Sequence, residues 1–96
     1  MKSYDSIISS FIIENDIRCI PDQRGNVWFE LKDVIKALKL STFDDIQNIT
    51  VISYMINNEE ILFISRKTVG YLITQSNTRY AKEMFTNSSY AFRWFK

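Results

Sequence analysis

The chain has 96 residues, a formal net charge of +1, one cysteine and no histidine. This length suits a single domain, and a hydrophobic content of 46 % is enough for a packed core. The lack of histidine excludes Ser-His and Cys-His catalytic arrangements, and with one cysteine it excludes zinc fingers and ribbons. We therefore expect one domain over residues 1–96 that is not an enzyme and holds no metal or cofactor.

The N-terminal segment gives the first predicted elements. Residues 1–10 are predicted to be a lead-in or an edge strand, and residues 11–13 a strand. The segment has no signal-peptide pattern, and no apolar run approaches the roughly 20 residues needed to span a bilayer. The lone cysteine, Cys19, cannot form a disulfide within the chain, which indicates a reducing, intracellular compartment. Cys19 is expected to be a small buried residue of a strand.

Residues 17–40 predict a β-hairpin followed by an amphipathic helix. Residues 21–25 have turn composition and lie between two short runs of β-branched and aromatic residues. The helix is expected to lie across the hairpin, with Trp28 and Phe29 as large contacts on opposite faces of the strand. Its apolar stripe has helical spacing and consists of Leu31, Val34, Ile35 and Leu38.

The next segments predict a second short helix and a second hairpin. Ser41 or Thr42 can cap the helix, which should end near residues 48–50. Residues 51–55 and 61–64 are apolar and β-prone, and they flank a polar turn.

Two more helices are predicted from Ser65 onward. Ser65 can cap the third helix, in which Gly70 indicates the close approach of another backbone. A break at residues 76–78 caps the fourth helix. The expected buried side of the fourth helix consists of Ala81, Met84 and Phe85. The predicted fold is therefore α+β, with two β-hairpins forming a small antiparallel sheet packed against three to four short helices.

Three blocks of the sequence form a recognisable series. The first block contains Ile17-Arg18, Gly25, Trp28-Phe29, Lys32-Asp33-Val34 and Ala37-Leu38. The second contains Phe63-Ile64-Ser65 and Gly70-Tyr71-Leu72-Ile73. The third contains Ser76, Ala81-Lys82 and Phe85. In this order they resemble the Bro-N domain, the amino-terminal module of Bro (baculovirus repeated open reading frame) proteins of large DNA viruses, also found in phage antirepressor-like proteins. The resemblance is strongest over residues 11–85, and residues 86–96 form a divergent aromatic and basic tail.

The resemblance implies nucleic-acid binding and a viral regulatory role without catalysis. We expect a DNA-binding regulator, in the host cytoplasm or nucleus if the virus infects a eukaryote. The alternative is a protein–protein module of antirepressor type that binds another regulatory protein rather than DNA. The small net charge and the aromatic tail favour this alternative. Formation of a homodimer would lengthen the footprint of so small a module.

The distribution of charge points to the candidate DNA contacts. Residues 1–60 contain six Lys/Arg and ten Asp/Glu, a net charge of −4. Residues 61–96 contain six Lys/Arg and one Asp/Glu, a net charge of +5, which marks a basic surface for an acidic partner. The predicted phosphate contacts are Arg66, Lys67, Arg79, Lys82, Arg93 and Lys96, with Arg18 and Arg24 near the first turn. The third and fourth helices are expected to bring their cations onto one exposed surface. The alternative is an ordinary solvated surface.

Overall fold

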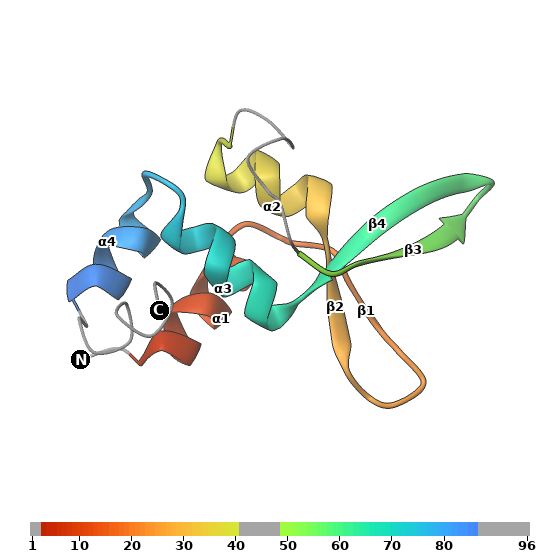
Figure 1. Ribbon diagram of the computed structural model, residues 1–96, viewed down its shortest axis with the longest axis horizontal. Coiled ribbons are helices and arrows are strands. Elements are labelled where there is room, and N and C mark those ends of the chain that lie inside the picture. Colours follow the sequence, from red (N-terminus) through yellow and green to blue (C-terminus); the bar gives the residue numbers. More distant parts are fainter. Residues whose placement is uncertain (1–2, 41–48, 87–96) are drawn as a thin grey trace.

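Four helices and a four-stranded antiparallel sheet make up the described part of the chain (Figure 1). The structure is a computed structural model that describes residues 3–40 and 49–86. In chain order the elements are α1 (Tyr4–Glu14), β1 (Cys19–Pro21), β2 (Val27–Glu30), α2 (Leu31–Leu38), β3 (Val51–Ile56), β4 (Glu59–Ser65), α3 (Arg66–Thr74) and α4 (Arg79–Thr86). The predicted α+β fold is confirmed. The helix predicted near residues 41–50 and the C-terminal tail lie outside the described residues.

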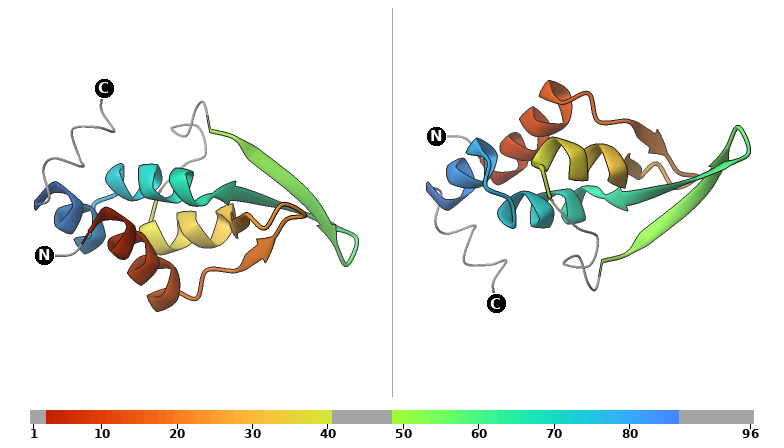
Figure 2. Two further views of the ribbon diagram at one scale, coloured as in Figure 1. Left: turned by 90° about the horizontal axis from the view of Figure 1, so that it is seen from below. Right: turned by 90° about the horizontal axis from the view of Figure 1, so that it is seen from above.

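The sheet is built from the two predicted hairpins. The strand order is β1-β2-β4-β3, so β2 and β4 join the hairpins at the centre of the sheet, where Phe29 pairs with Ile64. Asn57 and Asn58 close the β3–β4 hairpin with positive φ angles of 53° and 65°, which asparagine tolerates better than most residues. Both hairpins project away from the helices, in diverging directions (Figure 1), and Figure 2 shows the helices gathered at the opposite end.

The strand predicted at residues 11–13 is wrong, because these residues belong to helix α1. Ser3 caps the helix by accepting a hydrogen bond from the Ser6 amide at 3.1 Å. A short β-branched run fits a buried helix as well as a strand. Here the cap and the burial of Ile7, Ile8 and Phe11 on one helix face decide for the helix.

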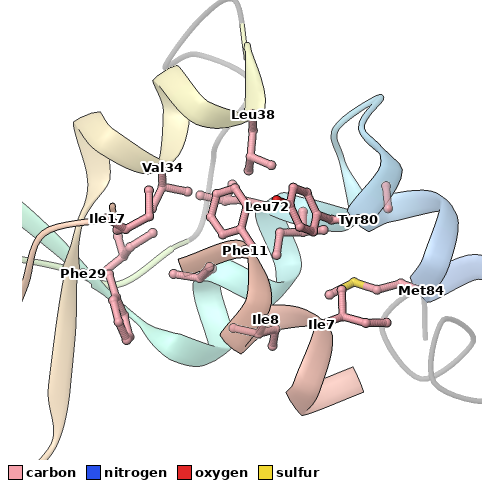
Figure 3. Close-up of a cluster of buried hydrophobic side chains, with 14 of the residues drawn as sticks. Ile7, Ile8, Phe11, Ile17, Phe29, Val34, Leu38, Leu72, Tyr80 and Met84 are labelled. Atoms are coloured by element: carbon pink, nitrogen blue, oxygen red, sulfur yellow. The ribbon is translucent and has the colours of Figure 1, made fainter. Parts of the chain in front are cut away.

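The main hydrophobic core lies where α1 meets α2, α3, α4 and the central strands (Figure 3). Phe11 is 0 % exposed and meets the ring of Tyr80 edge-on, with 5.2 Å between ring centroids. The largest fully buried side chains of the described residues include Phe11, Phe63, Ile7, Leu31, Leu38, Ile64, Leu72, Ile73 and Met84. Helix α1 therefore contributes directly to the core, although the sequence analysis predicted a lead-in or edge strand over residues 1–10 and a strand over residues 11–13.

Three predictions about single residues change in the structure. Gly70 is indeed closely approached, but by side chains of α1: a Cβ there would lie 2.8 Å from Ile8 Cδ1 and would also clash with Tyr4. Cys19 is exposed rather than buried, because β1 is a short edge strand paired only with β2. Of the predicted buried side of α4, Ala81 and Met84 are buried, but Phe85 is 45 % exposed, because the helix turns Tyr80 to the core instead.

No described helix is both long enough and apolar enough to cross a membrane.

Candidate nucleic-acid interface

The tip of the β1–β2 hairpin is held by one carboxylate. Asp22 Oδ1 accepts hydrogen bonds from the amides of Arg24 at 2.8 Å and Asn26 at 2.9 Å. Its Oδ2 accepts from Trp28 Nε1 at 2.9 Å. Gly25 completes the turn with φ of 84°, a conformation that favours glycine. Trp28 is thus half-buried over the turn, while Phe29 alone of this predicted pair enters the core.

These hydrogen bonds make the tip sensitive to acid. The Trp28 indole N–H, with the amides of Asn26 and Arg24, lowers the pKa of Asp22 below its ordinary value of 3.8. A carboxyl whose pKa is lowered by folding stabilises the tip above its unfolded pKa, and this stabilisation is lost as the pH falls through the lowered value. A carboxyl-carbon NMR titration should give a midpoint below 3.8 for Asp22. Trp28→Phe should move this midpoint back toward 3.8, and an unchanged midpoint would contradict this account.

A groove runs between strand β2 and the start of helix α3. It has a volume of about 600 Å³ and is lined by Gly25, Asn26, Val27, Trp28, Phe29, Ser65, Arg66 and Lys67. These residues include two cations and no carboxylate. At the α3 end, Ser65 caps the helix by accepting from the Thr68 amide at 3.2 Å, and a helix N-terminus favours anions. The groove therefore suits a negatively charged ligand.

Arg66 lies in this groove but is already bonded to α1. Its Nε donates to Asp5 Oδ1 at 2.9 Å, and its Nη2 donates to the Asp5 carbonyl at 2.8 Å and to Ser9 Oγ at 2.6 Å. The arginine fastens the start of α1 to the start of α3, so its charge is largely neutralised within the molecule.

Arg79 is bonded to the other end of α1. Its Nη2 is paired with Glu14 and donates to Tyr80 Oη at 3.1 Å, and its guanidinium carbon lies 4.9 Å from the centre of the Tyr80 ring. Tyr80 Oη in turn donates to Glu14 at 2.8 Å. The two arginines thus bind opposite ends of α1, and the structure does not gather them on one exposed surface as the sequence predicted.

The other predicted contacts are distributed as follows. Lys67 is exposed and makes no ion pair with another described residue, and Lys82 is exposed on α4. Arg24 is exposed at the hairpin tip next to Gly25, and lines a hollow there with Tyr54. Arg18 forms an ion pair with Glu30, with 3.7 Å between Arg18 Nε and Glu30 Oε2. Arg93 and Lys96 fall outside the described residues.

Sequence reasoning missed the groove but named its cations. Lys67 and Gly25 are far apart in the chain, and only the pairing of β2 with β4 brings them near each other, with Trp28 opposite Ser65. The predicted hairpins did not indicate which of their strands would pair, so no local signal placed the start of α3 beside β2. Among residues 3–40 and 49–86, no group of three metal-binding side chains lies together.

Residues 16–88 match the family model described as BRO family, N-terminal domain, which covers most of the chain. The chain belongs to this family. No curated protein and no solved structure matches it. In this Bro-N domain the matched residues begin after α1, yet α1 fills part of the core and is bound by Arg66 and Arg79 from within the matched residues.

Proposed function

We propose that this Bro-N domain is a regulatory module, virus-encoded as the resemblance implies, that binds duplex DNA through its phosphates. The observation that carries the proposal is the groove between β2 and α3, whose lining has cations and no carboxylate. Of the cations at the groove and the hairpin tip, Lys67 and Arg24 have no ion-pair partner among the described residues, so they are the ones assigned to phosphates. The start of α3 adds backbone N–H groups that suit the same ligand.

The hairpin tip suits a second part of the same contact. Asp22 fixes the turn, so Arg24 is presented from a rigid backbone and loses less conformational freedom on binding. Two-stranded ribbons can enter a DNA groove, which makes Arg24 and Asn26 the groups nearest to bases in this proposal. Affinity would come mainly from phosphates, with limited reading of sequence.

The test compares two double variants with matched changes of charge. Arg24→Gln with Lys67→Gln should weaken binding to duplex DNA about tenfold and lower the slope of log affinity against log salt by about 2. Lys36→Gln with Lys39→Gln removes the same charge from the last turn and the C-cap of helix α2 and should change the slope little. Fluorescence anisotropy between about 50 and 200 mM salt measures both. Equal losses in the two variants would overturn the assignment of the groove.

A second function is favoured by the arginines. Arg66, Arg79 and Arg18 each have a carboxylate partner, which leaves fewer cations for phosphates than the sequence suggested. This favours the antirepressor-like alternative, in which the domain binds another regulatory protein. An absence of binding to duplex DNA at about 50 mM salt, where phosphate contacts are strongest, would support the alternative and contradict our proposal.

A further inference from the structure

The two edges of the sheet are protected very differently. Strand β1 has three residues, ends in Pro21, which has no N–H to donate, and follows the charged Arg18. Strand β3 at the other edge has six residues, Val51–Ile56, with no charged residue and no proline. No described segment pairs with its outer side. Long, uncharged edge strands of this kind are templates for pairing with another chain.

The backbone groups that face outward from β3 follow from its turn. A two-residue turn makes Ile56 and Glu59 the flanking pair, and such a pair exchanges both backbone hydrogen bonds. Because hydrogen-bonded and non-hydrogen-bonded pairs alternate, Val51, Ser53 and Met55 direct their N–H and C=O groups away from β4. The same alternation, followed from β3 through β4 to β2, makes the backbone groups of Glu30 face β1. The observed hydrogen bond from the Glu30 amide to the Arg18 carbonyl, at 2.9 Å, agrees with this assignment. The outer edge of β3 therefore offers three donors and three acceptors in a regular row.

The side chains beside this row are apolar and exposed. Met55 is 68 % exposed and Val51 is 36 % exposed, and both point to the same face of the sheet as Ser53. Tyr54, on the other face, is 38 % exposed and is supported by an edge-on contact with Phe63 at 5.8 Å. Covering this edge would remove apolar surface from water as well as satisfy the backbone.

We propose that β3 pairs with β3 of a second copy of this chain, antiparallel about a two-fold axis at Ser53, so that one sheet continues through both copies. In this register Ser53 faces Ser53 of the partner subunit. Val51 faces Met55 of the partner subunit, and Met55 faces Val51 of the partner subunit. This register agrees with a two-fold axis perpendicular to the sheet. Directly paired residues lie on the same face of a sheet, and Val51, Ser53 and Met55 share one face.

Charge and symmetry favour a second copy over an unrelated peptide. The strand is self-complementary about Ser53, because its apolar residues meet and its outward backbone groups match. The acidic pair Glu59 and Glu60 at the turn lies at opposite ends of the joined strands in the two copies. Glu60 pairs with Met55 within one copy, and Met55 lies about 13 Å along the strands from Met55 of the partner subunit. This separation exceeds the screening length of about 8 Å in physiological salt, so the acidic turns of the two copies repel each other little. An edge contact of this kind buries less than the roughly 1,200 Å² typical of stable complexes, so the dimer should be weak and reversible.

Sedimentation velocity on the full chain tests the dimer. Because no DNA is present in this experiment, its result does not depend on the proposed function. The chain should pass from monomer to dimer between about 10 µM and about 1 mM. Met55→Lys should raise the dissociation constant about tenfold or more, because it places a charge in the apolar pairing. Ile13→Lys is the matched control, since Ile13 is 75 % exposed on α1, far from the strand edge, and should leave the dimer unchanged.

A cross-link tests the register. In a Cys19→Ser background, Ser53→Cys should form an intermolecular disulfide with oxidised glutathione, because directly opposed Cα atoms at about 5.5 Å suit that bond. Tyr54→Cys, whose equivalents are diagonal rather than opposed, should cross-link far less. A chain that stays monomeric throughout the concentration series overturns the proposal, as does a dimer that Met55→Lys does not weaken. Equal cross-linking at both positions overturns the Ser53 register.

Discussion

Replacing Phe11 by alanine is expected to lower the free energy of unfolding by about 3–5 kcal/mol. Phe11 is 0 % exposed, packs edge-on against Tyr80, and lies in the core between α1 and the other helices. Removing its ring leaves a cavity that rigid neighbours cannot fill. Small domains have only about 5–15 kcal/mol in total, so the loss is a large fraction of stability. Urea unfolding followed by circular dichroism measures it.

The control for this prediction lies two residues further along the same helix. Ile13→Ala removes an apolar side chain that is 75 % exposed and should change the free energy of unfolding by less than about 0.5 kcal/mol. A loss below about 1 kcal/mol for Phe11→Ala would show that α1 contributes little to the fold. The result matters for the family, because α1 precedes the residues that match the BRO family model.

The neighbours Arg66 and Lys67 are expected to separate stability from DNA binding. Arg66→Gln should cost about 1–2 kcal/mol of unfolding free energy, because it removes charge-assisted hydrogen bonds to Asp5 and Ser9 that are partly screened by solvent. Lys67→Gln should cost less than about 0.5 kcal/mol, since Lys67 is exposed and has no carboxylate partner among the described residues.

The order reverses when DNA binding is measured. Lys67→Gln should lower the salt slope of DNA affinity by about 1, whereas Arg66→Gln should leave the slope nearly unchanged, because Asp5 already neutralises that charge. Each variant serves as the control for the other, since both remove one positive charge at adjacent positions. Equal slopes for the two variants would contradict the division of roles, and a stable Arg66→Gln protein would contradict the structural role.

Local patterns in the sequence determined most of the elements. The turn composition of residues 21–25 and the helical stripe from Leu31 to Leu38 led to β1, β2 and α2 as observed. The polar turn after Ile56 and the Ser65 cap likewise led to β3, β4 and α3. These signals are local, because turn, cap and period each depend on residues a few positions apart.

Helix α1 was missed although local signals for it are present. Its apolar residues follow the i, i+3, i+4, i+7, i+8 spacing of an amphipathic helix, and Ser3 can cap it; the apolar residues are Tyr4, Ile7, Ile8, Phe11 and Ile12. What local rules could not supply is where α1 packs, because its contacts are with residues more than fifty positions away, such as Tyr80 and Gly70.

The candidate site shows the same division between sequence and tertiary structure. The sequence by itself determined which side chains carry positive charge, and that the second half of the chain holds the excess. Only the tertiary structure decided which charges remain for a partner: folding of α1 brought Asp5 to Arg66 and Glu14 to Arg79, while Lys67 stayed exposed beside the β2 groove. The physical reason is that an ion pair forms between groups close in space, and α1 sets that proximity through apolar packing that no charge pattern reveals.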